Sequence, residues 1–441
     1  MSLPTQQTGH LSHPAPVYVL PNMSPGLGRS YRFLRFMFVV LGLIVVLNLN
    51  VFSNRLLGNG QFFSPIILLF SLLAVLYSRV GRISQLPFAT RMFGFAIVFF
   101  VFAGVLSKVA NGLGSPVTLA IAVAKDLATP IVFFGTVFLS ASMKKLGGEK
   151  GEGQVLTIVY WLAFAGVMTI FIPLVFPQWH YFIRGDERNF SRFGGVYDNP
   201  NPASMAALAF MVCGLARTAR EKKLIYLMIT IGAGAAAILL TGSRAGILGT
   251  VFIVLPLAGF VFSFKQIIRV VLTFVVVAAV GLTILFTLRQ QTDSRLRGQA
   301  KRAQLLLSIA DRGLDDETTG GRTGLAVIAF KMWKTSPLIG LGLGSSRGML
   351  PYTDLGPHNY YLTILVESGL FGLIPFLFLW SCVGAKSFDR NNPNWIRILI
   401  IGIFLTISFY ALTSHTIFNQ RNQVFFIGAA MGLSVLPRRR K

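Results

Sequence analysis

The chain has 441 residues, of which 54% are hydrophobic and only 12% are charged. Because an average soluble domain carries about 25% charged residues, this composition indicates many membrane spans and excludes a large separate soluble domain. The formal net charge of +25 would suggest nucleic acid in a soluble protein, but in a membrane protein it is typical of basic cytoplasmic loops and anionic ligands. We therefore expect membrane lipids but no nucleic acid among its partners. Cys213 and Cys382 lie inside apolar runs, so we expect neither a disulfide framework nor a metal site.

Apolar runs follow one another along most of the chain. A membrane-crossing helix needs about 20 mostly apolar residues, so these runs predict an all-α integral membrane protein with about twelve transmembrane helices. The first run is long enough to span and follows a polar N-terminus that ends near Ser30, so we expect no cleaved signal peptide. The predicted spans are residues 35–52, 62–78, 92–107, 117–141, 154–175, 203–216, 224–240, 245–263, 267–288, 361–384, 396–414 and 423–436.

Lysine and arginine residues in the short loops predict the orientation, because cytoplasmic loops carry an excess of them. With twelve spans, the basic loops lie on the same side as Arg29, Arg32 and Arg35, which precede the first span, and as the basic C-terminus. Both termini are then cytoplasmic. The predicted segments are a cytoplasmic tail at 1–34, nine spans at 35–288, a periplasmic loop at 289–357, three spans at 358–436 and a basic cytoplasmic tail at 437–441.

Two substantial loops are predicted on the outer side, at residues 177–202 and 289–357. The longer one begins with the basic stretch Arg295–Leu307, whose spacing predicts an amphipathic helix on the membrane surface. A second helix is predicted from Thr323 to Trp333 and ends near Pro337. The glycines of Gly340–Gly344 predict flexible backbone that allows another segment to approach closely.

Several arginines break the charge rule on the outer side. A cation near the bilayer needs a partner or water, so each is a candidate site residue, although arginines at span ends also snorkel to lipid headgroups. Arg244 stands in the short turn Thr241–Gly246, and Arg322 opens the second loop helix, whose free N–H groups favour an anion. The remaining candidates are Arg192 in the first outer loop, with Arg184 and Arg188 nearby, and Arg421 in the last outer turn, near His415.

A histidine at the mouth of the tenth span is the candidate base. His358 follows Pro357, and histidine titrates near neutral pH, so it can take a proton from a hydroxyl group; the alternative is a helix-start residue that merely meets solvent. Glu367, nine residues later, lies within the membrane, where a structural partner is the favoured interpretation. Asn201 is expected to cap the sixth span with Pro202 at its first position, or else to contact a sugar.

The carboxylates exclude some chemistries. Glu149, Glu152, Glu221 and Asp389 are scattered over cytoplasmic loops, whereas a nucleotide-sugar transferase with a divalent metal would need clustered acids there. The acidic cluster Asp315–Glu317 is interpreted as a solvated outer loop. Lys125 and Asp126 inside the fourth span could be a local ion pair, part of a transport path or the sign of a kink, and the sequence leaves these open.

Taken in order, these segments resemble the O-antigen ligase and polymerase superfamily. The resemblance rests on Thr241–Gly246, on Gly321-Arg322 with Trp333, on Pro337–Gly344, and on His358–Leu362 with Glu367-Ser368-Gly369; it covers roughly 190–375, beginning with Arg192–Gly195 before Asn199-Pro200-Asn201. It implies a GT-C-like helical glycosyltransferase in the inner membrane of a bacterium, acting on its periplasmic side. It also implies an undecaprenyl diphosphate-linked glycan donor, a glycolipid or glycan acceptor, no cofactor or metal, and inversion at the sugar carbon.

The resemblance also implies roles for residues. Arg244 and Arg322, together with Arg192, would bind the donor diphosphate, and His358 would activate the acceptor hydroxyl. The residues themselves agree with this chemistry, because fixed guanidinium groups can neutralise a leaving diphosphate without Mg²⁺ and a neutral histidine can accept the remaining proton. Supporting positions are Asn359, Glu367, Asn201, Arg421 and His415.

Ligation of O-antigen to lipid A–core and polymerisation of O-antigen or exopolysaccharide are hard to separate. Arg184 to Gly195 and Arg302 to Gly313 show an Arg-x(10)-Gly spacing described for polymerases, but so many arginines and glycines produce it by chance. Two amphipathic helices in one late outer loop favour the ligase. A twelve-span transporter, faintly suggested by Arg79–Arg82, would instead show two similar halves and a long central cytoplasmic loop.

Overall fold

The computed structural model describes residues 25–49, 63–78, 83–112, 116–176, 193–197, 199–289, 322–346, 356–414 and 421–435. Within these ranges the chain is helical and contains no strand, which confirms the predicted all-α class. The elements are α1 (Pro25–Val46), α3 (Phe63–Leu76), η1 (Ile83–Gln85), α4 (Phe88–Ala110), α5 (Pro116–Met168), η2 (Thr169–Phe171), α6 (Ile172–Val175), α7 (Pro200–Glu221), α8 (Leu224–Thr241), α9 (Arg244–Gly249), the π-helical η5 (Thr250–Val254), α10 (Leu255–Val261), α11 (Phe264–Arg289), α15 (Arg322–Thr335), α16 (Tyr360–Ala385), η6 (Lys386–Phe388), α17 (Asn394–Ala411) and α18 (Arg421–Leu433).

The helices fall on the apolar runs of the sequence. Each predicted span overlaps a helix, and α15 covers the helix predicted between Thr323 and Trp333. Several boundaries differ from the prediction. Among them, α1 begins at Pro25, before the predicted start at 35, and the fourth and fifth spans form one helical element, α5, bent at Gly148. Six helices of the described ranges are long and apolar enough to cross a membrane, and the count of twelve stays a prediction. These six are Phe88–Ala110, Leu127–Phe171, Pro200–Glu221, Leu224–Thr241, Tyr360–Phe388 and Asn394–Ala411.

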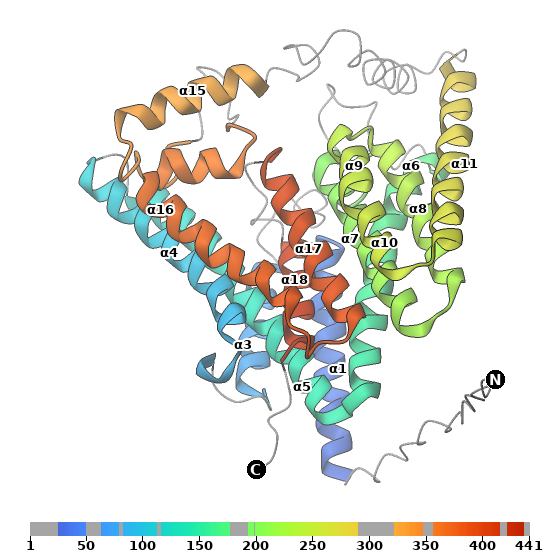
Figure 1. Cartoon of the computed structure of the whole chain (residues 1–441). Helices are drawn as coiled ribbons and strands as arrows, with labels where there is room; N and C mark the ends of the chain where they lie inside the picture. Colours follow the sequence, from blue (N-terminus) through green and yellow to red (C-terminus); the bar gives the residue numbers. More distant parts are fainter. Residues whose placement is uncertain are drawn as a thin grey trace, which may run out of the picture.

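The helices form three groups (Figure 1). On one flank α4 packs along α16, with α15 lying over the outer part of α16; on the other flank α8 packs between α7 and α11. Between these flanks α5 packs against α1, α3 and α18, while α17 joins α7 to α18. Gly428 and Gly432 of α18 allow this close approach, because an added Cβ would collide with Thr136 and Ser140 of α5.

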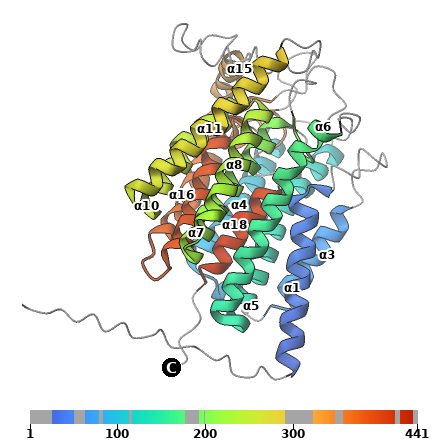
Figure 2. The same ribbon diagram turned by 90° about the vertical axis from the view of Figure 1, so that its right-hand side faces the viewer.

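The basic segments predicted on one side of the membrane share one end of the bundle. The Tyr31 hydroxyl near the start of α1 donates to the side chain of Gln154 at 2.8 Å. Lys144, in the bend of α5, donates to the carbonyl of Leu433 at the end of α18 over 2.7 Å. Arg220, at the end of α7, donates to the Glu149 carbonyl at 2.8 Å. This end, which we call the basic end, lies at the bottom of Figures 1 and 2.

A break in α16 shapes the opposite end. Gly369 has φ 61° and ψ −160°, which separates an outer segment that begins at Tyr360 from the rest of the helix. The loop after α15 completes the interrupted backbone bonds. Leu370 N–H donates to the Pro337 carbonyl at 3.0 Å, and Leu341 N–H donates to the Val366 carbonyl at 2.7 Å. A broken membrane helix needs such partners because lipid offers its free polar groups none.

The glycine-rich stretch makes the predicted close approach to its neighbours. Leu343 N–H donates to the Gly104 carbonyl of α4 at 2.9 Å, and the Ser107 hydroxyl of α4 donates to the Gly340 carbonyl at 2.9 Å. Gly340 has φ 73°, and a Cβ there would lie only 2.5 Å from the Ser368 nitrogen. A side chain at this position would therefore push the loop away from the break.

Candidate functional site

A two-residue connection between α8 and α9 holds Arg244 at the end of the bundle opposite the basic end. Gly242, with φ 57°, reverses the chain after α8. Ser243 then caps α9, since its hydroxyl oxygen accepts the Gly246 N–H at 3.3 Å. Arg244 is the first helical residue and is half-buried. The turn predicted from Thr241–Gly246 is therefore confirmed, and the Ser243 cap sets Arg244 as the first residue of α9.

Asn201 lies beside this turn, but it does not cap α7. The cap is Asn199, whose side chain accepts the Asn201 N–H at 3.0 Å, and Pro200 occupies the first helical position. The prediction of Asn201 as the cap was therefore wrong by two residues. The Asn201 side chain instead accepts a bond from the Ser243 hydroxyl at 3.4 Å, next to Arg244. This contact ties the start of α7 to the turn that carries the arginine.

Tyr410 of α17 is linked to Asn201 through the side chain of Ser204. It is fully buried, and its hydroxyl hydrogen-bonds the hydroxyl of Ser204. Ser204 in turn donates to the Asn201 carbonyl at 2.9 Å. Sequence reasoning missed Tyr410 and Ser204, because both lie within apolar runs that predict only membrane spans. A hydropathy pattern does not distinguish a tyrosine or serine whose buried hydroxyl group makes a hydrogen bond from an ordinary core residue.

Arg322, the first residue of α15, comes from the outer loop and lies within electrostatic range of Arg244. Burial lowers the pKa of the Arg322 guanidinium, the charge of Arg244 lowers that pKa further, and Tyr410 raises it. The two guanidinium groups are thus close enough to repel each other, although both remain protonated. Within the described part of the chain, neither has a carboxylate at salt-bridge distance. Two like charges with no carboxylate at salt-bridge distance among the described residues are suited to an anion.

His358 completes the cluster. It stands just before α16, where Asn359 is the cap and accepts the Leu362 N–H at 3.0 Å. Its φ of 50° is uncommon for a residue other than glycine and indicates a position held by its surroundings. Burial lowers the pKa of the imidazole below the ordinary 6.5, and the charge of Arg322 lowers that pKa further. This shift favours the neutral imidazole, which is the form that can accept a proton.

Other predicted site residues have different surroundings. Glu367 is buried and accepts a hydrogen bond from Ser346, so it fastens the loop after α15 to α16, in agreement with the structural interpretation. Arg421 begins α18 and donates to the Ser64 hydroxyl of α3 at 3.4 Å, which turns its guanidinium toward α3. Arg192, His415, the acidic cluster Asp315–Glu317 and the predicted helix Arg295–Leu307 lie outside the described residues, as do the side chains of Lys125 and Asp126.

The arrangement places two guanidinium groups and an imidazole within electrostatic range of one another. Arg244, Arg322 and His358 come from α9, α15 and the start of α16, yet the charge of Arg244 acts on Arg322 and that of Arg322 acts on His358. Two guanidinium groups in such a place could stabilise negative charge that develops on a leaving group, and a neutral imidazole could take a proton from an attacking hydroxyl. Such a site is chemically suited to transfer a group from a phosphate-type carrier to a hydroxyl.

Comparison with known protein families points the same way. Residues 226–377 match the family model described as O-Antigen ligase, and this range includes all three residues of the cluster. No curated protein sequence matches the chain.

Proposed function

We propose that this chain, which belongs to the O-antigen ligase and polymerase superfamily through residues 226–377, transfers a glycan from a polyprenyl diphosphate to an acceptor hydroxyl. Its membership makes it a membrane enzyme of the glycosyl-transfer type. The observation that carries the specific reaction is the convergence of Arg244, Arg322 and His358 at one end of the bundle. In this reaction the two arginines would bind the diphosphate leaving group and the histidine would accept the proton of the acceptor hydroxyl.

In the proposed reaction the acceptor oxygen attacks the anomeric carbon of the donor sugar from the face opposite the diphosphate. A new carbon–oxygen bond forms, the bond to the diphosphate oxygen breaks, and the configuration inverts. The proton of the hydroxyl passes to the His358 imidazole. The charge that appears on the leaving diphosphate is neutralised by Arg244 and Arg322, so the step needs no divalent metal. Polyprenyl diphosphate is the second product.

Ligation to a lipid A–core acceptor is the favoured form of this reaction. The long outer loop supports it: α15 rests Leu325 and Ala329 on the bundle and exposes Val327 and Phe330 on its other faces. An exposed apolar helix face above the site suits an acceptor that is itself a glycolipid. Loss of the protein distinguishes ligase from polymerase in cells. A missing ligase leaves long glycans unattached to lipid A–core, whereas a missing polymerase leaves single repeat units.

Reconstitution of the purified protein with a lipid-linked glycan and an acceptor tests the reaction directly. We expect polyprenyl diphosphate to be released and glycosylated acceptor to form, with the same rate in EDTA as in Mg²⁺. Movement of the intact lipid-linked glycan across the bilayer without release of polyprenyl diphosphate would instead identify a transporter. If EDTA abolished turnover and Mg²⁺ restored it, the carboxylates of Asp315, Asp316 and Glu317 would become the first ligands to test.

The cluster lies at the end of the bundle opposite the basic end, which supports a periplasmic site because basic loops face the cytoplasm. In a Cys382→Ser background, in which the remaining Cys213 is buried, we expect Thr335→Cys to react with an impermeant thiol reagent in intact spheroplasts. Lys150→Cys, equally exposed but at the basic end, is the matched control and should react only after lysis. The opposite pattern would place the site on the cytoplasmic side.

A further inference from the structure

A narrow apolar groove lies between α8 and α11 and starts at the basic end of the bundle. It has a volume of about 260 Å³ and is lined by residues of these two helices. Leu227 and Ile231 are buried and form its floor, whereas Met228 and Leu272 are 57% and 55% exposed. The groove therefore opens along the side of the protein that membrane lipid would contact.

The groove extends over part of one membrane leaflet. Its lining residues on α8 run from Leu224, just after Arg220 of the basic end, to Ile231, and those on α11 run from Gln266 to Thr273. At about 1.5 Å per residue, each wall measures about 10 Å, less than half of the roughly 30 Å of a bilayer core. A chain that enters from the basic end therefore stays within the nearer leaflet.

Four exposed cations surround the mouth of the groove. Among the described residues, none of the four has a carboxylate at salt-bridge distance, and Glu221, the acid nearest to them in sequence, is paired with Arg217 at 2.9 Å. This positive charge is therefore left for an external anion. The four are Lys222 and Lys223, directly before the lining residue Leu224, together with Lys265 and the lining residue Arg269 of α11.

Gln266 adds neutral donors at the same place. Its side-chain oxygen accepts a hydrogen bond from the Ser263 N–H at 3.0 Å and another from the Ser263 hydroxyl at 3.2 Å. These bonds leave the amide N–H groups of Gln266, which lies one helical turn before Arg269, available to an acceptor. Phosphate oxygens accept hydrogen bonds from both kinds of donor, and the charged donor makes the stronger bond.

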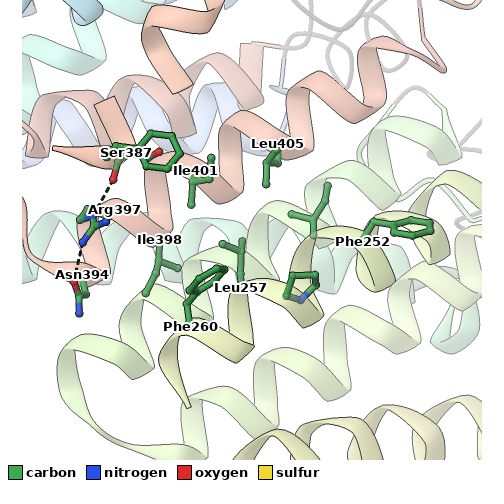
Figure 3. Close-up of a pocket in the computed structure, with 12 residues that line it drawn as sticks. Phe252, Leu257, Phe260, Ser387, Asn394, Arg397, Ile398, Ile401 and Leu405 are labelled. Atoms are coloured by element: carbon green, nitrogen blue, oxygen red, sulfur yellow. Dashed lines mark hydrogen bonds between the residues drawn. The ribbon is translucent and has the colours of Figure 1, made fainter. Parts of the chain in front are cut away.

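A second apolar groove, between η5–α10 and α17, provides a comparison (Figure 3). It also ends at the basic end, but its lining cation already has partners. The Arg397 Nε donates to the Ser387 carbonyl at 2.9 Å, and its Nη1 donates to the Asn394 side chain at 3.3 Å. The nearby Lys386 pairs with Asp389 at 2.6 Å. Of the two grooves, the one between α8 and α11 thus has charge available for a ligand.

We propose that the groove between α8 and α11 binds an anionic phospholipid of the leaflet at the basic end, with one acyl chain in the groove and the phosphate among the four cations. Charge complementarity selects a headgroup of net negative charge, because a zwitterionic headgroup brings a cation of its own into the same cluster. The length of the groove selects a chain that ends within one leaflet. The site is at the opposite end of the bundle from Arg244 and is independent of the proposed reaction.

The bound lipid would complete the packing of α11. Within the described elements this helix packs chiefly against α8, and Val275, Val276 and Val280 farther along it are more than half exposed. An acyl chain in the groove adds apolar contact to both helices at their shared seam. Because a ligand that binds only the folded state stabilises it, the anionic lipid should also raise the temperature at which the protein unfolds.

Native mass spectrometry of the purified full chain measures the binding, with dioleoyl phosphatidylglycerol and dioleoyl phosphatidylethanolamine as probes. The natural chain should retain phosphatidylglycerol in preference, and Lys265→Gln/Arg269→Gln should bind it at least about tenfold more weakly. Lys150→Gln/Arg390→Gln removes two exposed cations from the same end but outside the groove, and it should bind like the natural chain. Equal loss in both double variants, or equal retention of phosphatidylethanolamine, would show only the general attraction of a basic surface and would overturn the proposal.

Filling the groove tests the acyl chain separately from the charge. Leu272→Trp keeps all four cations and should weaken phosphatidylglycerol binding at least about tenfold, because the indole occupies the place of the chain. Ile401→Trp, in the groove of Figure 3, is the matched control and should leave the binding unchanged. Glycerol phosphate, which carries the anion without the chains, should not displace the lipid.

The charge-conserving variant Lys265→Arg/Arg269→Lys should restore the binding that the glutamine variant loses, which separates a lost contact from a misfolded protein. Normal binding by Leu272→Trp, or displacement of the lipid by glycerol phosphate, would reduce the site to an anion site without an acyl chain. A dimer of the chain that Leu272→Trp dissociates would show that a second copy covers the groove. Each of these results would overturn the proposal.

Discussion

Turnover of a His358→Ala variant should be about 10²- to 10⁴-fold slower than that of the natural chain, the usual contribution of a positioned general base. Donor binding should change little, because the diphosphate is assigned to Arg244 and Arg322. Alanine at φ 50° also introduces backbone strain of about 1–2 kcal/mol, so a second variant is needed. His358→Asn tolerates this conformation but cannot accept the proton, and it should lose as much turnover as alanine. Recovery of activity in the asparagine variant would show that the backbone, and not the base, had been tested.

The pH dependence provides the control for this assignment. Because burial and Arg322 lower the His358 pKa below 6.5, the free enzyme should hold its kcat/KM as pH falls to 6.5 and lose it only at more acidic pH. The sign follows from the mechanism, in which the neutral imidazole is the active form. A bound diphosphate would raise the same pKa, so the acidic limb of kcat should lie at higher pH than that of kcat/KM. If the His358→Asn variant kept the same acidic limbs as the unsubstituted enzyme in its residual activity, the titration would belong to another group.

An Arg322→Lys variant should lose about 10²- to 10³-fold in turnover, the range found when one donor to a developing negative charge is removed. Lysine keeps the charge but not the planar fork that binds two phosphate oxygens, and Arg322 starts α15 within electrostatic range of Arg244. Unlike the histidine variants, this one should also bind the donor more weakly. The measurements are single-turnover rate and donor affinity in the reconstituted system.

The matched control for Arg322 is Arg390→Lys, an exposed arginine between η6 and α17, which should keep the natural rate. A rate for Arg322→Lys close to that of the control would mean that Arg322 only contacts lipid headgroups. A rate loss with full donor affinity would place the guanidinium on the acceptor or the transferred sugar instead of the diphosphate.

The sequence predicted the helices well because hydropathy and helix length are local properties. It also predicted the Arg244 turn, since glycine readily takes the left-handed conformation that ends a helix and serine caps the helix that follows. It wrongly favoured Asn201 over Asn199 as the cap of α7, because each is an asparagine followed by proline; the Asn201 side chain instead contacts Ser243, 42 residues away. The partner of Glu367 could not be predicted either, because Ser346 is 21 residues away in the sequence and the two side chains meet only in the folded structure.

Some differences arise from how polar groups behave at membrane edges. α1 begins at Pro25 and includes Arg29, Arg32 and Arg35, because a helix can continue beyond the apolar layer while its arginines extend to water. The bend of α5 is shorter than the predicted basic loop: Gly148 alone leaves helical geometry, and Lys144 pairs with Glu152 across it at 2.9 Å. Tyr410 was missed because a buried hydroxyl group in an aromatic side chain counts as apolar in any composition window.

The break at Gly369 joins α16 to the loop after α15, so that two of the three cluster residues belong to one bonded unit. The loop that follows α15 is bonded to α16 on both sides of the break, so Arg322 and His358 are carried by one self-completed stretch, whereas Arg244 sits on the facing wall. That stretch therefore carries the proposed base and one proposed phosphate ligand together as a single structural unit. Chimeras within the superfamily should be cut before Arg322 and after Ala385, because a junction inside this unit would separate the broken helix from the loop that completes its backbone bonds.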